Sequence, residues 1–301
     1  MRIYLVRHGE SVAQERTDWY QQAMQPIGLT QLGQLQAQEA GRQFAAWLHG
    51  RPDQLQVYSS PYLRARQTRD IFMQQGDLDA CARKPDDLMD DRIGEREQGD
   101  FAGINPKDYG KIRRGEKKLQ CGETVRPYDP AIDESYMQLR EQGNTYDAKP
   151  PNGECGKELC DRIRSFIAEK QLRTPDRDVI VFAHSNVIDA FISILSTRDE
   201  AGCRACYNHI MRDPNNITGN ACVVMLEDSK GTGVFDVTRL PQIKPPKTMD
   251  GGALQTRPHP AAERHYLHLT DFKGDSRTRP WQQRVEEPAA AASSARPAPQ
   301  R

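Results

Sequence analysis

Short apolar runs alternate along this chain with segments whose apolar residues recur at helical intervals. The apolar runs predict strands over residues 2–6, 55–60, 178–184, 221–227 and 233–238, with a turn between the last two. Helical spacing predicts helices over 29–48, about 62–75, 156–172 and 186–195, the second with Pro61 at its first position. The alternation predicts an α/β fold, a three-layer sandwich whose mainly parallel central sheet is flanked by helices.

Two stretches depart from this alternation. Residues 101–153 are polar, rich in glycine and proline and weakly periodic, which is typical of a lid or an insertion over an active site. Residues 245–301 are rich in proline and end in the low-complexity segment EEPAAAASSARPAPQR. We therefore predict one domain over 1–244, with a lid inserted at about 101–153, followed by a mostly disordered Pro/Ala-rich tail.

The composition narrows the classes of partner. The 42 basic and 42 acidic residues cancel, which argues against a nucleic-acid or anionic-membrane partner. A mean hydropathy of -0.80 is low for a fully folded chain and agrees with the predicted tail. Every apolar run is shorter than the ~20 residues of a membrane span. The first run is followed by charged residues before it reaches the length of the apolar part of a signal peptide. Seven irregularly spaced cysteines fit reduced thiols. We expect a cytoplasmic protein.

Cations and imidazoles follow three of the predicted strands. Arg7 and His8 follow the first, Arg64 and Arg66 open the helix after the second, and His184 ends the third. Because parallel strands bring their carboxyl ends to one edge of a sheet, we expect these groups to converge. Arginine forks suit phosphoryl oxygens, and a neutral imidazole can attack phosphorus to form phosphohistidine. The residues predict phosphoryl transfer, not metal binding.

Such a reaction also needs a proton donor for the leaving oxygen. The acid-rich segment DDRIGEREQGDFAG offers several carboxylates, among which the chemistry alone does not choose: Asp90, Asp91, Glu95, Glu97 and Asp100. Gly9, next to the first imidazole, would let the backbone approach the substrate without an intervening side chain.

Six motifs in chain order resemble the histidine phosphatase superfamily, the phosphoglycerate mutase-like group, over about residues 1–240: RHGES, LTQLGQLQA, YSSPYLRARQT, EREQGDF, NGEC and FAHSN. The resemblance implies the phosphoglycerate mutase-like fold and a histidine phosphatase that uses no metal or other cofactor. It places the nucleophile at His8, a second catalytic histidine at His184 and the proton donor at Glu95. Arg7 and Arg64 become phosphate ligands, and the predicted phosphate-binding set also includes Gln14, Gly9 and Ser185.

Three positions depart from the family pattern. Gln14 stands where the family often has asparagine, and a phosphate contact from its longer side chain stays open. Ser185 replaces the usual glycine after the second histidine and could narrow the pocket. Cys155 replaces the serine of GES at a predicted helix start, where a thiol caps poorly.

Other polar motifs receive structural interpretations. Arg66 is a candidate for a solvated helix charge, and Glu95 has salt bridging to Arg92 or Arg96 as its structural alternative. Glu154 is expected to cap the following helix, in preference to hydrogen bonding within the site. The cationic run KIRRGEKK at 111–118 is interpreted as a solvated loop in preference to a cationic lid. Cys203, Cys206 and His209 resemble zinc ligands, but a fourth at convincing spacing is missing, although Cys222 could donate. We expect these thiols in a loop after the His184 helix.

The resulting hypothesis is a phosphomonoester hydrolase acting on a small phosphorylated substrate or a phosphoprotein through phosphohistidine on His8. A phosphoglycerate-type phosphomutase is the alternative within the same chemistry. A catalytically silent phosphate-binding scaffold is the alternative from another class. The sequence leaves the oligomeric state open.

Overall fold

The computed structural model describes residues 1–15, 27–48, 55–85, 88–101, 119–121, 124–126, 130–173, 178–212, 219–240 and 246–247. All of these lie within the first of two compact units, which spans Met1–Tyr266. The cationic run at 111–118 and the predicted tail, apart from 246–247, lie outside the described residues. So does most of the first half of the predicted lid.

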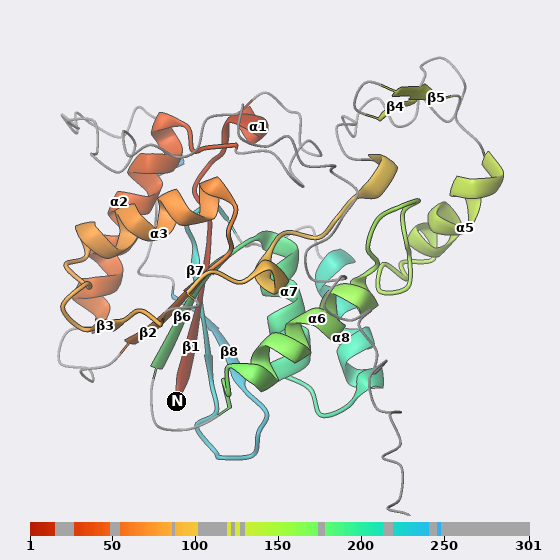
Figure 1. Ribbon diagram of the computed structural model, residues 1–301. Coiled ribbons are helices and arrows are strands. Elements are labelled where there is room, and N and C mark those ends of the chain that lie inside the picture. Colours follow the sequence, from red (N-terminus) through yellow and green to blue (C-terminus); the bar gives the residue numbers. More distant parts are fainter. Residues whose placement is uncertain are drawn as a thin grey trace, which may run out of the picture. The chain divides into compact units, whose positions relative to one another are not determined.

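A six-stranded sheet forms the centre of the fold (Figure 1). Its strands, in spatial order, are β3 (Ala82–Arg83), β2 (Leu55–Ser59), β6 (Asp178–Ala183), β1 (Arg2–Arg7), β7 (Val223–Glu227) and β8 (Asp236–Arg239). The first four run parallel to one another, whereas β7 is antiparallel to both of its neighbours. The prediction of a mainly parallel central sheet is confirmed, although β8 begins later than the predicted strand.

Helices cover both faces of this sheet. Their bounds are α1 (Val12–Glu15), α2 (Gln31–Leu48), α3 (Leu63–Gln75), α5 (Pro130–Glu141), α6 (Gly156–Glu169), α7 (Ser185–Leu195) and α8 (Glu200–Arg212). Figure 1 shows α2 and α3 on one face of the sheet and α6, α7 and α8 on the other. Short 3-10 helices lie at Asp91–Ile93 and Gly99–Phe101, and a small hairpin joins β4 (Leu119–Cys121) to β5 (Thr124–Arg126).

The central strands are buried on both faces because alternate side chains enter two different apolar clusters. Tyr4 and Val6 of β1 pack with Phe44 and Phe72 of α2 and α3. Leu5, on the opposite side of the same strand, packs with side chains of α6 and α7. In the described part of the chain, no helix is both long and apolar enough to cross a bilayer.

Helix α5 lies within the predicted lid at about 101–153, and its Tyr136 stacks on Phe101 with ring centroids 5.2 Å apart. Two local predictions are wrong. The cysteine segment is not a loop but helix α8, because Cys203 and Tyr207, one turn apart, both face the core. Helix α3 begins at Leu63, so Pro61 precedes the helix and does not occupy its first position.

Candidate active site

Three strand ends meet at the carboxyl edge of the parallel sheet. Arg7 pairs with Ala183 in register, and Ser59 pairs with Phe182, so the residues after each strand emerge side by side. The backbone N–H of His8 donates to the carbonyl of Ala183 at 3.1 Å. As a result, the rings of His8 and His184 lie with centroids 5.2 Å apart, although the two residues are far apart in the chain.

His8 is buried and oriented by its neighbours. Its Nδ1 lies 2.7 Å from the carbonyl oxygen of Gly9, which can only accept, so the ring proton resides on Nδ1. Nε2 therefore carries the lone pair, and Nε of Arg64 donates to it at 3.3 Å. Burial, reinforced by the charges of Arg64 and Arg7, holds the pKa of His8 well below its usual value. The geometry presents a neutral imidazole with a nucleophilic Nε2.

His184 is also buried, at the end of β6 where it precedes α7. Its Nε2 lies 2.8 Å from Oγ of Ser60, and the ring of Tyr62 packs against it at 5.1 Å between centroids. Nδ1 has no hydrogen-bond partner among the described residues. Burial first, and then the charge of Arg64, keeps the pKa of His184 well below its usual value. Ser60 and Tyr62 line the site although the sequence analysis assigned them no role.

The two arginines differ from ordinary surface cations. Arg64 is fully buried, and burial lowers its pKa to about 10. Burial also lowers the pKa of Arg7. It is Arg64 that contacts His8. Arg66, two residues further along α3, is only half-buried. Concentrated cationic charge beside two neutral imidazoles is suited to a tetrahedral anion.

Glu95 lies within electrostatic reach of both arginines. Its charge is the largest influence raising the pKa of Arg7 and of Arg64 against the effect of burial. The side chain is half-buried, and its Oε1 accepts from the backbone N–H of Arg96 at 2.8 Å. The alternative of a salt bridge to Arg92 is not what the structure shows, since Arg92 pairs with Asp90 and Glu169.

The remaining predicted phosphate ligands have defined surroundings. Gln14, on α1, accepts from the backbone N–H of Ser11 at 3.0 Å and donates to Asn220 at 3.2 Å. Ser185 is the half-buried first residue of α7.

Gly9 also has a packing reason to be glycine, besides the predicted approach of its backbone to the substrate. A Cβ there would lie 2.3 Å from the carbonyl oxygen of Gly33, at the start of α2. The loop after His8 therefore packs directly on that helix, and the backbone N–H of Gly9 donates to Oγ1 of Thr68 at 3.0 Å.

The other polar motifs also have defined partners. Glu154 does not cap α6 but pairs with Arg162, while the helix start is capped by Glu158, which accepts from the N–H of Cys155 at 3.0 Å. Sγ of Cys203 lies 4.0 Å from Sγ of Cys160. Within the described ranges, no group of three or more His, Cys, Asp or Glu side chains is arranged to hold a metal ion.

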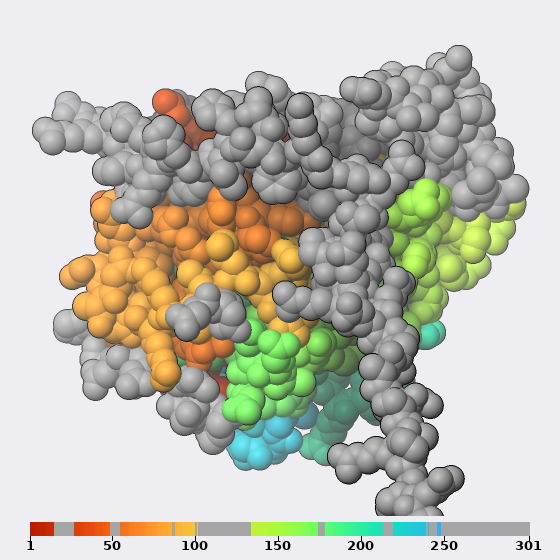
Figure 2. Space-filling view, viewed as in Figure 1, coloured from red at the N-terminus to blue at the C-terminus, as the bar shows by residue number. Residues whose placement is uncertain are grey.

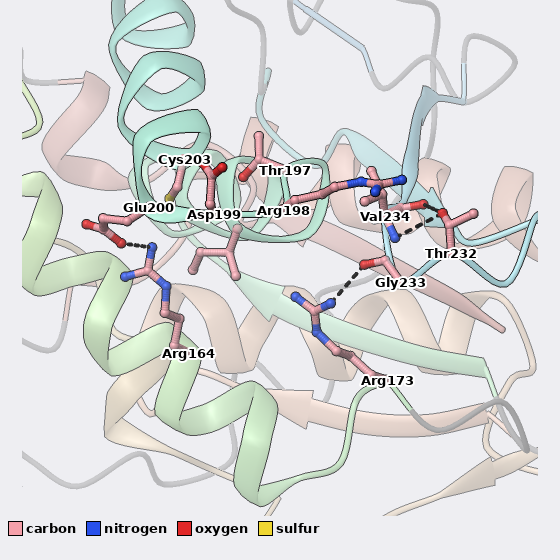
Figure 3. Close-up of a pocket in the computed structure, with 11 residues that line it drawn as sticks. Arg164, Arg173, Thr197, Arg198, Asp199, Glu200, Cys203, Thr232, Gly233 and Val234 are labelled. Atoms are coloured by element: carbon pink, nitrogen blue, oxygen red, sulfur yellow. Dashed lines mark hydrogen bonds and ion pairs between the residues drawn. The ribbon is translucent and has the colours of Figure 1, made fainter.

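A separate pocket of about 380 Å³ lies at the opposite end of α7 from His184 (Figure 3). Arg164 lines it and forms an ion pair with Glu200 at 2.6 Å, while Arg173 donates to the carbonyl of Gly233 at 2.8 Å. The pocket is therefore lined by cations and by carboxylates that neutralise part of their charge. It is not part of the histidine site.

The parallel sheet ends in two neighbouring imidazoles and two arginines, of which Arg64 is fully buried, at the positions that the resemblance to histidine phosphatases assigns to the site. The model of the histidine phosphatase superfamily (branch 1) matches residues 3–142 and 129–210, well over half of the chain. The chain belongs to this superfamily.

Individual relatives carry two kinds of name. The 2,3-bisphosphoglycerate-dependent phosphoglycerate mutase of Methylorubrum extorquens (strain PA1) is 27% identical over 203 residues, covering 64% of this chain and 78% of the relative. The mutase of Nitrobacter winogradskyi is 27% identical over 198 residues, covering 64% and 80%. A mycobacterial glucosyl-3-phosphoglycerate phosphatase, solved in complex with VO3, shares the fold with a TM-score of 0.52 and 21% identity, covering 79% of this chain and 96% of that one. Bacillus stearothermophilus YhfR shares it with a TM-score of 0.53 and 18% identity, covering 81% and 99%.

Proposed function

We propose that this protein is a phosphomonoester hydrolase that transfers the phosphoryl group of its substrate first to His8 and then to water. The observation that supports this proposal most directly is the orientation of His8. With the proton held on Nδ1 by the Gly9 carbonyl, Nε2 has a lone pair for attack on phosphorus. Arg64, which donates to that nitrogen, can donate instead to a phosphoryl oxygen.

The proposed reaction has two steps. In the first, Nε2 of His8 forms a bond to phosphorus while the bond from phosphorus to the ester oxygen breaks, and the carboxylic acid of Glu95 gives its proton to that leaving oxygen. In the second, the Glu95 carboxylate takes a proton from water as the water oxygen attacks phosphohistidine and releases inorganic phosphate. Arg7, Arg64 and His184 hold the phosphoryl oxygens, which spread the transferred charge. Neither step needs a metal or another cofactor.

A phosphomutase is the second candidate, because the relatives that are 25–27% identical are named phosphoglycerate mutases. In a mutase, phosphohistidine returns its phosphoryl group to a bound substrate, and water must be excluded meanwhile. The two candidates share the first step and differ in what accepts the phosphoryl group in the second.

The test begins with phosphate release from p-nitrophenyl phosphate, with and without EDTA. We expect turnover that EDTA does not change, and no turnover in a folded His8→Ala variant. His209→Ala, at an exposed position on α8, serves as the matched histidine control and should keep wild-type activity. Full activity in His8→Ala would overturn the mechanism.

A second assay separates the candidates. The enzyme is given 3-phosphoglycerate together with 2,3-bisphosphoglycerate, and both isomers and free phosphate are followed. Rapid interconversion without phosphate release would establish the mutase. Stabilisation by phosphate with no turnover on any of a broad set of phosphomonoesters would establish a silent binding protein.

A further inference from the structure

Helix α6 carries a buried ion pair that the proposed reaction does not use. Nε of Arg162 donates to Oε1 of Glu154 at 2.7 Å, and Nη2 donates to Oε2 at 2.9 Å, so the guanidinium binds the carboxylate through two parallel hydrogen bonds. The two side chains are 5% and 1% exposed. Burying two charges costs free energy that their attraction seldom exceeds, so stability alone is a weak reason for such a pair.

The remaining donors of Arg162 reach the backbone of the segment that carries Glu95. Nη1 donates to the carbonyl of Arg92, and Nη2 donates to the carbonyl of Glu95 itself at 3.3 Å. One guanidinium therefore ties α6 to two points of this segment. Figure 2 shows the amber atoms of the segment after β3 beside the green atoms of α6, and Arg92 also pairs with Glu169 at the end of that helix.

Glu154 holds the same segment from the other side. Its backbone N–H donates to the carbonyl of Glu97 at 2.9 Å, and its Oε2 accepts from the N–H of Glu97 at 3.4 Å. The same two stretches of backbone also lie close together at Gly99. Its φ of +55° suits glycine, and a Cβ there would lie only 2.1 Å from the carbonyl oxygen of Pro151. Backbone groups before Glu95, at Arg92, and after it, at Glu97, as well as the carbonyl of Glu95 itself, are thus bound by this pair.

We propose that Arg162 and Glu154 are positioning residues that hold the Glu95 carboxyl group where it can protonate the leaving oxygen. This inference rests on the proposed role of Glu95. A proton donor has to come within about 2.6–3.2 Å of the oxygen that it protonates. A misplacement of about 1 Å can cost about 100-fold in rate, so a rigid backbone anchor for the donor has a direct catalytic value. The charge of Arg162 also contributes to the lowered pKa of His184, which agrees with its closeness to the site.

Two substrates with different leaving groups distinguish a misplaced proton donor from a general loss of activity. β-Glycerol phosphate loses a strongly basic alkoxide that needs the proton, whereas p-nitrophenyl phosphate loses a stable phenolate that does not. We expect Glu95→Gln to lower kcat/KM for β-glycerol phosphate by about 100-fold or more and to change that for p-nitrophenyl phosphate by only about threefold. Arg162→Lys keeps the positive charge but loses the two parallel hydrogen bonds of the guanidinium. Glu154→Gln removes the negative charge that holds Arg162 in place. Both variants should show the same split between substrates, meaning a larger loss of kcat/KM for β-glycerol phosphate than for p-nitrophenyl phosphate. We expect the loss for β-glycerol phosphate to be about tenfold or more.

Arg164→Lys is the matched control. Arg164 lies two residues further along the same helix and pairs with Asp161 and Glu200, away from the Glu95 segment. This variant should leave kcat/KM for both substrates unchanged. If Arg162→Lys unfolds, the double substitution Glu154→Gln with Arg162→Met removes both charges together and leaves no unpaired ion, and it should still show the split.

The outcomes distinguish the role of Glu95 from the role of the pair. If Glu95→Gln lowers kcat/KM for both substrates equally, or for neither, the proposed role of Glu95 is wrong. If Glu95→Gln shows the split but the folded Arg162 and Glu154 variants lower kcat/KM for both substrates equally or leave both values unchanged, the pair has only a structural role and the inference is overturned.

Discussion

Nε of Arg64 lies 3.3 Å from Nε2 of His8, and both side chains are buried at the carboxyl edge of the sheet. Burial keeps the imidazole neutral, and the contact adds to this effect because a second positive charge beside the guanidinium is disfavoured. Burial is also unfavourable for the charged arginine, and it lowers the pKa of Arg64 to about 10. The site therefore holds cationic charge where little water can solvate it. A bound anion would offset the unfavourable free energy of burying that charge.

Replacing Arg64 should separate activity from stability. We expect Arg64→Met to lower kcat/KM by about 100-fold to 1,000-fold, since a fixed positive charge beside the transferred group is lost. The same substitution should leave the melting temperature unchanged or raise it, because a buried cation is replaced by an apolar side chain of similar length. Arg66→Met, at the half-buried neighbouring arginine, is the control and should cost much less activity. The reverse order of activity loss would show that Arg66 is the phosphate ligand.

Anion binding should stabilise the folded protein through the same charges. A ligand that binds only the folded state at about 100 times its Kd adds about 2.7 kcal/mol to the free energy of unfolding. We expect inorganic phosphate to raise the melting temperature of the wild-type protein and to have little effect on Arg64→Met. Chloride at equal ionic strength is the control for general screening. An equal shift in both proteins would place the phosphate elsewhere.

The sheet and the meeting of its strand ends could be predicted from the sequence because both depend on local pattern. Runs such as residues 178–183 are too apolar to lie anywhere but between two helical layers, and parallel strands place the residues after them at one edge. Arg7, His8 and His184 were found in this way. The choice of Glu95 among several carboxylates came from the family resemblance, because nothing in the acidic segment itself separates Glu95 from Glu97.

The residues that the sequence analysis missed contribute through three-dimensional contacts. Arg162 stands in the charged stretch CDRIRS, which suggests a solvated face. Its spacing gave a usable signal, since Leu159, Arg162, Ile163 and Phe166 share one face of the helix and all four are buried. Buried arginines are usually paired with a group that offsets their charge, and only the structure shows that Glu154 is the partner of Arg162. Helix α8 has a similar signal in its sequence, since Cys203 and Tyr207 stand one helical turn apart and both are buried.

The packing of the loop after His8 on α2 makes a prediction about two helical glycines. A Cβ at Gly33 would lie 2.0 Å from the carbonyl oxygen of Glu10, whereas a Cβ at Gly202 of α8 would come no closer than 3.2 Å to any neighbour. We expect Gly33→Ala to lower the free energy of unfolding by about 2 kcal/mol or more, because backbone next to His8 must move. Gly202→Ala should stay within about 1 kcal/mol of the wild type, since alanine favours the helix. Urea unfolding measures both, and equal effects would show that this loop has room to adjust.

The two buried imidazoles predict how stability depends on pH. The pKa values of His8 and His184 both lie well below the usual value of 6.5, mainly because of burial. Below about pH 6.5 the unfolded chain therefore takes up protons that the folded protein does not, and stability falls as the pH falls. Each such group contributes a slope of about 1.4 kcal/mol per pH unit in that range and none at higher pH.

His184→Gln tests this dependence because glutamine can keep a hydrogen bond to Ser60 but does not titrate. We expect the slope of the free energy of unfolding against pH, measured below about pH 6.5 in buffers without phosphate, to decrease by about 1.4 kcal/mol per pH unit. The exposed His209→Gln is the matched control and should keep the wild-type slope. Equal slopes in the wild type and His184→Gln would mean that His184 accepts its proton in the folded protein. The second imidazole of the site would then be a cation at mildly acidic pH, and the assignment of a neutral pair would be wrong.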